Sequence, residues 1–529
     1  MAIIEGMARP TATRRISAWR TPLLALGLVL LAFASGPADA ATTFTVNSTD
    51  DTGDISISDG TCDSDPVDGE QCTLRAAIEE ANHTAGADTI EFDIVDGTNP
   101  AKTISPASQL PTITDTITID GYTQSGATPN TLVEGNDALL NVQLDGLNAG
   151  SGADGLVIEA ADSTIRGLVI RRFEDTGVQI SGGATGNRIE GNYIGTNAEG
   201  TDDLGNAELG IDVINADDNT IGGTTAGARN VISGNDQSGV LINGPEATDN
   251  RIEGNYIGTN AEGTADLGNT QDGVAVESAR NTVGGTTAGA RNVISGNDQS
   301  GVFIGFEATE NRVEGNYIGT TADRTGDLGN TAAGVTIQES ANFTAVGGIA
   351  SGATNRIAHN GTDGVSISGS NSGGNNILSN SIFDNGELGI DIVGGAEDAS
   401  GVTANDPQDP DTGPNTLQNY PRIVTATRSN TTGLTTISGR LNSNPTQDFV
   451  IQCFHTNGEP ASAHGEGLRL LATTFVSTNA TGDAGFSCVS SRPSLGQVPE
   501  QTVSATATNV LTTGDTSEFS KNKAITTVP

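Results

Sequence analysis

Four oxygen-bearing side chains fall within ten residues of one another late in the chain: Asp406, Asp409, Asp411 and Asn415. The prolines and the glycine between them favour turns that fold the segment back on itself. Carboxylate and amide oxygens are the ligands that calcium prefers in proteins. The pattern therefore predicts a calcium site, and the alternative interpretation is a solvated acidic linker that binds no ion.

Other acidic residues form weaker patterns. Asp63, Asp65 and Asp68 follow Cys62 closely and make a second, poorer calcium candidate. Six more acids recur in equivalent loops of a repeat, where we expect them only to keep the loops solvated: Glu199, Asp203, Glu262, Asp266, Asp323 and Asp327.

No set of residues has the pattern of an assembled catalytic site. A glycoside hydrolase needs two carboxylates that face one bond, but adjacent acids such as Asp202 and Asp203 point to opposite sides of a strand. A lyase needs a unique basic residue, whereas Arg188, Arg251 and Arg312 recur identically and favour a structural stripe. His359 lies in a variant of a repeated turn, and we assign it no catalytic role.

The four cysteines form two pairs that are local in sequence, Cys62 with Cys72 and Cys453 with Cys488. An even number split in this way predicts two disulfides in an exported chain. A zinc site would need four clustered ligands, so these positions do not favour one.

The first forty residues have the three zones of a secretory signal: four arginines, an apolar run from Leu23 to Phe33, and Ala38-Asp39-Ala40. Removing four Arg, Glu5 and Asp39 takes the formal charge from −41 to −43. Such a surface repels phosphate backbones, so we expect no nucleic-acid partner. The apolar run is too short to span a bilayer, so we expect no membrane span and a secreted, cell-surface or periplasmic location.

A repeat dominates the middle of the chain. Asn187-Arg188-Ile189-Glu190-Gly191-Asn192-Tyr193-Ile194 returns from Asn250 and, with one change, from Asn311. The Asn that opens each unit recurs about every 31 residues, at Asn187, Asn219, Asn250, Asn281, Asn311 and Asn342. Each unit has three short apolar pieces between turn residues, which predicts a three-faced parallel β-helix with stacked asparagines. We expect the recurring Tyr193, Tyr256 and Tyr317 to pack rather than to bind a ligand.

The flanking regions differ from the repeat. Leu74, Ala77, Ile78 and Ala81 have helical spacing behind Thr73, which predicts a capped helix that plugs the open end of the solenoid. Strand-like runs after the linker predict a small immunoglobulin-like sandwich. We divide the chain into residues 1–40 (signal), 41–125 (cap and first strands), 126–401 (β-helix), 402–421 (Asp/Pro-rich linker) and 422–529 (sandwich).

Cys72-Thr73-Leu74-Arg75-Ala76-Ala77-Ile78 resembles the cap of bacterial exported proteins named for a Cys-Ser-Leu-Arg-Glu-Ala motif, with Thr in place of Ser and Ala in place of Glu. The coils resemble the right-handed parallel β-helix that follows this cap, and residues 405–421 resemble the junction to the family's last sandwich domain. The resemblance implies an all-β fold on the surface or outside the cell, and implies no activity.

These observations favour a secreted or cell-surface β-helix protein without catalysis, used in adhesion, surface display or extracellular matrix interaction. Its partner would be an extracellular polysaccharide or another cell-surface component, with calcium as its ion. The alternative is a calcium-assisted polysaccharide lyase, hydrolase or epimerase, because many β-helices of the pectate-lyase type are such enzymes. A unique cluster that interrupts the repeat on one face would favour the enzyme.

Overall fold

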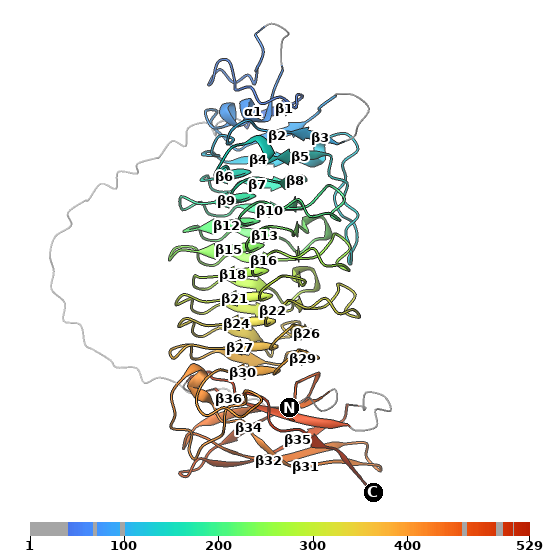
Figure 1. Ribbon diagram of the computed structural model, residues 1–529, viewed down its shortest axis with the longest axis vertical. Coiled ribbons are helices and arrows are strands. Elements are labelled where there is room, and N and C mark those ends of the chain that lie inside the picture. Colours follow the sequence, from blue (N-terminus) through green and yellow to red (C-terminus); the bar gives the residue numbers. More distant parts are fainter. Residues whose placement is uncertain (1–40, 67–70, 96–100, 457–462, 493–500, 511–512) are drawn as a thin grey trace, which may run out of the picture. The chain divides into compact units, whose positions relative to one another are not determined.

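The computed structural model describes residues 41–66, 71–95, 101–456, 463–492, 501–510 and 513–529. These residues belong to one compact unit, Ala40–Pro529. The expected signal segment, residues 1–40, lies outside the described residues. Short strands, stacked in chain order, fill most of the described part, and longer strands follow after residue 421 (Figure 1).

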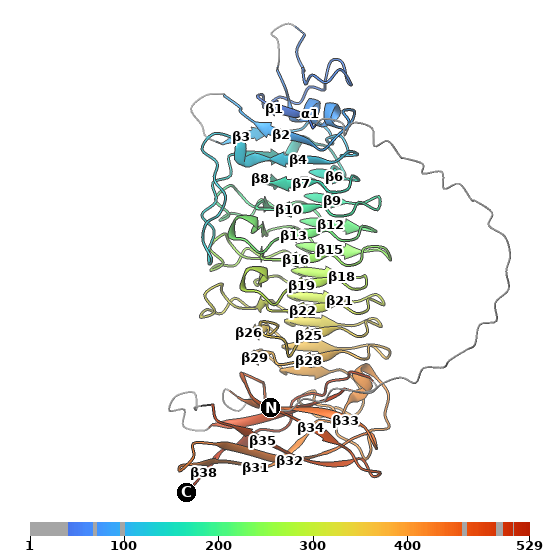
Figure 2. The ribbon, with the colours of Figure 1, turned by 180° about the vertical axis from the view of Figure 1, so that it is seen from behind.

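The short strands form three parallel sheets, which we call sheets 1, 2 and 3. Sheet 1 has eleven strands: β1 (Thr43–Val46), β2 (Asp88–Phe92), β4 (Ile117–Asp120), β7 (Thr164–Arg166), β10 (Arg188–Glu190), β13 (Thr220–Gly222), β16 (Arg251–Glu253), β19 (Thr282–Gly284), β22 (Arg312–Glu314), β25 (Ala345–Gly347) and β28 (Asn376–Leu378). Figure 2 shows most of them in order from behind.

Sheet 2 has ten strands: β3 (Lys102–Ile104), β5 (Val142–Asp145), β8 (Leu168–Arg171), β11 (Tyr193–Ile194), β14 (Val231–Ile232), β17 (Tyr256–Ile257), β20 (Val293–Ile294), β23 (Tyr317–Ile318), β26 (Arg356–Ala358) and β29 (Ser381–Phe383). Sheet 3 has nine: β6 (Leu156–Ile158), β9 (Val178–Ile180), β12 (Ile211–Ile214), β15 (Val240–Asn243), β18 (Val274–Val276), β21 (Val302–Ile304), β24 (Val335–Ile337), β27 (Val365–Ile367) and β30 (Ile390–Ile392).

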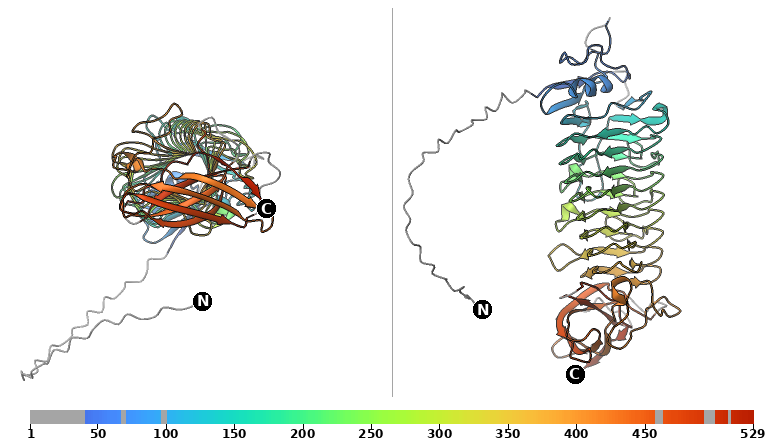
Figure 3. Two further views of the ribbon diagram at one scale, coloured as in Figure 1. Left: turned by 90° about the horizontal axis from the view of Figure 1, so that it is seen from below. Right: turned by 90° about the vertical axis from the view of Figure 1, so that its left-hand side faces the viewer.

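Each full coil contributes one strand to each sheet, so the fold is a right-handed parallel β-helix, as the repeat predicts. Like residues stack: Ile221 of β13 pairs with Ile189 of β10 on one side and with Ile252 of β16 on the other. All three are buried in the lumen. Full burial of such a side chain contributes roughly 1.5–3 kcal/mol. The period of the sequence thus sets both the pairing and the core. Figure 3 shows the stacked coils from the side and from below.

Three ladders of buried asparagines follow the turns between the sheets. Ladder 1 precedes sheet 1, ladder 2 lies between sheets 1 and 2, and ladder 3 lies between sheets 2 and 3. In each, the side-chain oxygen of one Asn accepts from the backbone N–H of the Asn one coil earlier, as Asn219 does from Asn187. The members are Asn187, Asn219, Asn250, Asn281 and Asn311; Asn192, Asn230, Asn255, Asn292, Asn316, Asn355 and Asn380; and Asn206, Asn235, Asn269, Asn297, Asn330, Asn360 and Asn385.

The expected position of Asn342 in the first series is wrong. Arg312 pairs with Ala345, so Thr344 and not Asn342 follows Asn311 in the stack. Asn342 instead pairs with Thr309, two residues earlier in the coil. Thr344 lies 33 residues after Asn311, because β24 ends at Ile337 and β25 begins at Ala345. A constant spacing of 31 residues therefore misplaces this position by two.

A short helix covers the first coil, as expected. α1 (Leu74–Ala81) is capped at its N-terminus by Thr73, whose hydroxyl accepts from the backbone N–H of Ala76. Leu74 and Ile78 are buried in the same hydrophobic core as the lumen. The helix therefore covers apolar surface that an open solenoid end would expose.

The C-terminal strands form two four-stranded sheets. One has the order β35 (Asp483–Ser490), β32 (Thr435–Asn442), β31 (Arg422–Ser429), β38 (Thr526–Val528). The other has the order β34 (Arg469–Ser477), β33 (Asp448–His455), β36 (Thr502–Asn509), β37 (Lys523–Ala524). They share a core that includes Ile437, Phe449 and Phe486, so they form a β-sandwich.

The sandwich is hydrogen-bonded to the last coil. Ile382 of β29 and Gly467 exchange two backbone hydrogen bonds, of 3.0 and 2.8 Å. Gln452 of β33 accepts from the backbone N–H of Ser379 at 2.8 Å. These contacts pair backbone groups at the edge of the solenoid that would otherwise be open to another chain.

Candidate functional site

Three of the four residues in the expected calcium site lie together. Asp406, Asp409 and Asp411 each place one carboxylate oxygen within 4.8 Å of the others. The segment that carries them precedes a short turn of 3₁₀ helix, η5 (Pro414–Leu417). The turn residues thus bring the three acids together, as the sequence predicts.

Asp409 is the anchored member of the group. Its carboxylate accepts from the side-chain amide of Gln418 at 2.8 Å and from the backbone N–H of Asn419 at 3.2 Å. The Ser443 hydroxyl donates to the same carboxylate. Burial, together with the charges of Asp411 and Asp406, raises the pKa of Asp409 to about 7, although the hydrogen bonds from Ser443 and Asn419 oppose the shift.

Asn415 does not join this group, so its place in the predicted ligand set is not supported. Its side-chain oxygen accepts from the backbone N–H of Asn375 at 3.0 Å, and its amide donates to the Asn375 carbonyl at 2.7 Å. Asn415 lies in the left-handed region, with φ 44°. The side chain therefore closes the coil end at β28 instead of facing the acids.

The remaining acids fit a divalent cation. Asp406 Oδ1 and Asp411 Oδ1 are buried and have no hydrogen-bond partner among the described residues. Burial also raises the pKa of Asp411, and the neighbouring Asp406 charge adds to the shift. Unpaired buried carboxylate oxygens are unfavourable, and a hard cation is the ligand that satisfies several of them at once.

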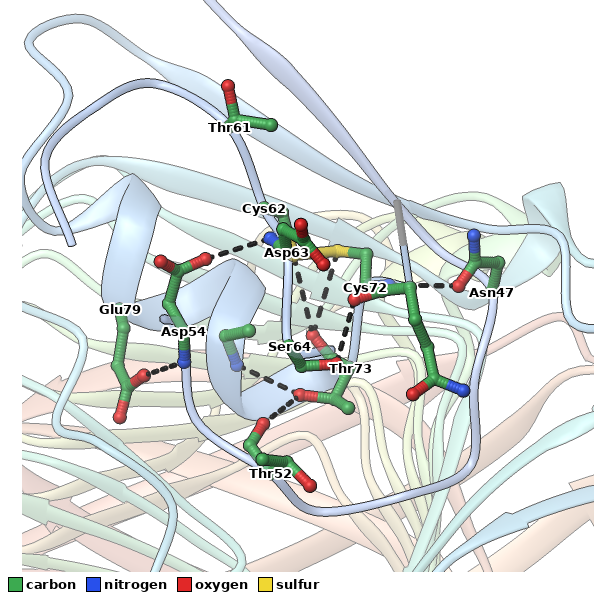
Figure 4. The surroundings of a disulfide bond; sticks show 12 residues. Asn47, Thr52, Asp54, Thr61, Cys62, Asp63, Ser64, Cys72, Thr73 and Glu79 are labelled. Atoms are coloured by element: carbon green, nitrogen blue, oxygen red, sulfur yellow. Dashed lines mark hydrogen bonds between the residues drawn. A yellow bond between two sulfur atoms is a disulfide. The ribbon is translucent and has the colours of Figure 1, made fainter. Parts of the chain in front are cut away.

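The second acidic candidate is arranged differently. The Asp63 carboxylate accepts from the backbone N–H of Asp65, and the Asp63 N–H donates to Asp54. These bonds hold the loop beside the Cys62–Cys72 disulfide (Figure 4). Asp68 lies outside the described residues. Within the described part, these acids shape a loop rather than converge on one point.

The structure contains both expected disulfides, Cys62–Cys72 and Cys453–Cys488. In Figure 4, the first one lies beside the start of α1, where Asn47 accepts from the backbone N–H of Cys72 and Thr73 donates to the Thr52 carbonyl. The second one joins β33 to β35, and so links the two sheets of the sandwich.

The repeated tyrosines pack, as expected. Tyr193, Tyr256 and Tyr317 are buried in a satellite core outside sheet 2. The loop of residues 124–141 covers part of this core, and the backbone N–H of Gly135 donates to the Tyr256 hydroxyl at 2.8 Å. The guanidinium of Arg229 lies 4.5 Å from the centre of the Tyr256 ring. These contacts are those of a packed surface.

The other residues considered for catalysis are also part of the repeat. Arg188 pairs with Thr220, which pairs with Arg251, so arginine and threonine alternate along the outer side of sheet 1. The Arg188 guanidinium donates to Glu190 at 3.0 Å. The ring of His359 packs edge-on against Phe383, with 6.0 Å between the ring centres.

A group of acids on sheet 3 was not predicted. Asp154, Asp175, Glu208 and Asp212 come from three successive coils, before or within β6, β9 and β12. Burial raises the pKa of Asp212 to about 7, with a further contribution from Asp154. Burial also raises the pKa of Glu208, and the charge of Asp175 and its hydrogen bond to Glu208 add to the shift. The signal in the sequence is the Glu-Leu-Gly-Ile-Asp segment at residues 208–212, which recurs at residues 387–391.

Among the described residues, none of the helices has both the length and the apolar character needed to cross a bilayer. No family model matches the chain, and no curated protein matches it.

Several solved structures resemble the chain weakly. The A-module of mannuronan C-5 epimerase AlgE6 from Azotobacter vinelandii is 17% identical, with a TM-score of 0.35, over 63% of this chain and 95% of that one. The periplasmic alginate epimerase AlgG is 16% identical, with a TM-score of 0.28, over 57% and 68%. Tailspike protein 2 of bacteriophage CBA120 is 13% identical, with a TM-score of 0.28, over 84% and 69%. At these values the likeness carries no functional inference, and the fold rests on the strand pairing.

Proposed function

We propose that this protein is an exported, non-catalytic β-helix scaffold that acts in adhesion, surface display or extracellular matrix interaction. The observation that supports it is the continuity of ladders 2 and 3, each of which runs through seven successive coils with bonded side chains, and of ladder 1, which runs through five. A buried amide in such a stack makes each coil depend on its neighbours. A long, regular surface is what a display protein needs, whereas an enzyme needs one place that differs from the rest.

The export part of this proposal rests on the disulfides and on the resemblance to exported proteins with a Cys-Ser-Leu-Arg-Glu-Ala type of cap. Disulfides persist in oxidising compartments, which include the periplasm and the cell exterior. The proposal further includes a calcium ion held by Asp406, Asp409 and Asp411. Calcium there would neutralise buried carboxylates at the segment that connects the solenoid to the sandwich.

A polysaccharide-cleaving enzyme is the second candidate, and the acids on sheet 3 favour it. Two carboxylates whose environments separate their pKa values can act as general acid and general base. Glu208 and Asp175 share a hydrogen bond, and Asp212 is a buried acid with a raised pKa in the same group. The Glu-Leu-Gly-Ile-Asp segment that carries Glu208 and Asp212 recurs at residues 387–391. There burial, with the charges of Asp363 and Glu387, raises the pKa of Asp391 to about 7, so a similar group of acids lies on the last strand of sheet 3.

Activity assays separate the two functions. We would incubate the protein with alginate, polygalacturonate and neutral glucans, and measure new reducing ends and unsaturated uronates with and without calcium. The scaffold proposal expects no product above the level of the Asp212→Asn variant. Product that disappears in Asp212→Asn and persists in the matched Asp202→Asn variant, whose acid lies in an exposed loop, would establish the enzyme.

A further inference from the structure

A cavity of about 490 Å³ lies in the C-terminal part of the chain, and its lining is basic. Its walls include Tyr420, Arg422, Ile423, Lys521 and Lys523. The chain has only three lysines, and two of them line this cavity. A basic cavity on a chain of charge −41 is a local reversal of sign that overall composition does not predict.

The basic groups are available for a ligand. Arg422, Lys521 and Lys523 are exposed, and none of them forms an ion pair with another described residue. The acids that act on this region electrostatically are Asp398, whose pKa Lys521 helps to lower, and Glu518, which lies near Tyr420. Arginines of the solenoid, in contrast, form ion pairs with neighbouring acids, as Arg166 does with Asp120.

Contacts within the protein hold the residues that line the cavity in place without a ligand. Asn405 donates from its side-chain amide to the Tyr420 carbonyl at 2.8 Å and accepts from the Tyr420 N–H at 3.0 Å. The Tyr420 ring packs edge-on against His464, with 4.9 Å between the ring centres. The backbone of Lys521 forms a β-bridge with that of His464, and Lys523 is the strand partner of Val503 in β36. Walls that are held in place reduce the entropy lost on binding.

The spacing of the charges suits an extended anion. Lys521 and Lys523 are two residues apart in an extended segment, so their side chains leave the backbone on the same side. Arg422 comes from the start of β31, about a hundred residues earlier. The volume lies in the range of sites that take a ligand of many atoms, and it exceeds what a single small anion needs.

We propose that this cavity binds a carboxylate-bearing sugar of an acidic polysaccharide. Arg422 and the two lysines would hold carboxylates through charge-assisted hydrogen bonds. The ring of Tyr420 and the side chain of Ile423 would contact the rings of the sugar. None of the residues that line the cavity is a ladder asparagine or an acid of sheet 3. It therefore does not depend on the scaffold proposal, and it remains a binding site whether or not the solenoid cleaves its substrate.

Calorimetric titration of the full exported chain with trigalacturonate tests the proposal. EDTA is present throughout, because calcium could otherwise bridge the ligand to acidic surface elsewhere. We expect one site whose affinity falls steeply as salt is raised. Methyl-esterified trigalacturonate has the same sugar rings without the charge, and we expect it to bind at least tenfold more weakly.

Variants assign the binding to the cavity. Lys521→Gln/Lys523→Gln and Arg422→Gln should each weaken trigalacturonate binding at least tenfold, while Arg251→Gln, which removes an exposed arginine from sheet 1, should leave it unchanged. Equal binding by the cavity variants would overturn the site. Equal binding of the methyl ester would overturn the role of the carboxylates, and inorganic phosphate or sulfate binding as tightly as trigalacturonate would overturn the assignment to a sugar. Unchanged melting temperatures show that the variants are folded.

Discussion

The Glu466 carboxylate accepts hydrogen bonds from both the backbone N–H and the side-chain amide of Asn385, each at 3.2 Å. Asn385 is the last asparagine of ladder 3, so Glu466 stands where the Asn of a further coil would stand. A residue of the sandwich segment thus ends a stack that the repeat itself leaves open. The last coil is closed by side chains from outside the repeat.

We predict that Glu466→Ala destabilises the folded chain. The substitution leaves the amides of Asn385 and Asp384 without their acceptor, and each hydrogen bond of this kind contributes roughly 0.5–1.5 kcal/mol. Glu466→Gln retains one oxygen acceptor and should lower the melting temperature less. The exposed Glu246→Ala is the control. Melting temperatures that do not differ between Glu466→Ala and this control would mean that the hydrogen bonds of Glu466 contribute nothing to stability.

Stability should fall as the pH rises from about 5 to about 8. Burial raises the pKa of Glu518 to about 8 and that of Asp391 to about 7. An acid whose folded pKa is raised binds its proton more tightly in the folded state. Its contribution is therefore complete below the unfolded pKa, and it is lost as the pH passes through the folded pKa. Melting temperatures measured across this range at constant ionic strength would test it.

The Glu518 carboxyl group accepts from the backbone N–H of Thr403 at 3.1 Å and from that of Ile392 at 3.3 Å. Glu518→Gln retains an acceptor but does not ionise, so it should flatten the decline between pH 6 and 8. Glu246→Gln, at an exposed position, should leave the decline as it is. A variant curve parallel to that of the parent chain would rule out Glu518 as a source of the pH dependence.

Calcium should raise the melting temperature more than sodium does at equal ionic strength. An ion bound only in the folded state stabilises it by about 2.7 kcal/mol at a hundredfold excess over its dissociation constant. Asp406→Asn/Asp411→Asn should remove the difference between the two salts, because these residues supply the oxygens without partners. Asp202→Asn/Asp203→Asn, in a repeated loop, serves as the control pair. Equal shifts of the melting temperature by both salts in the parent chain would mean that calcium acts only by screening charges.

Calcium affinity should also increase between pH 6 and pH 8. The pKa of Asp409 is raised to about 7, so a cation that needs the carboxylate must displace a proton below that pH. Calorimetry in buffers of different ionisation enthalpy would measure the protons released. A binding enthalpy that is the same in every buffer at pH 6 would contradict the involvement of Asp409.

Non-reducing peptide mapping should recover Cys62 linked to Cys72 and Cys453 linked to Cys488, with no crossed pairs. Replacing both cysteines of the second pair with Ala should lower the free energy of unfolding by roughly 2–4 kcal/mol, because the unfolded chain regains the freedom of the closed loop. A free thiol at any of these positions would contradict the pairing.

The sequence by itself determined the β-helix. A strand in a solenoid pairs with its own counterpart one coil away, so a period of about 31 residues carries the partner of each strand, the stacked lumen residues and the asparagine ladders. Thr73 and the helix after it, and the three acids of residues 406–411, were likewise predictable. In each of these cases the contacts are local or are repeated at a constant spacing.

Only the tertiary structure decided the features that join distant segments. Asn415 is four residues from Asp411, yet the left-handed backbone of η5 turns it to Asn375. Glu466 meets Asn385 from 81 residues away, and the walls of the basic cavity come from segments about a hundred residues apart. No period in the sequence relates such residues, because the packing of the sandwich segment against the last coil happens once and leaves no repeat from which it could be predicted.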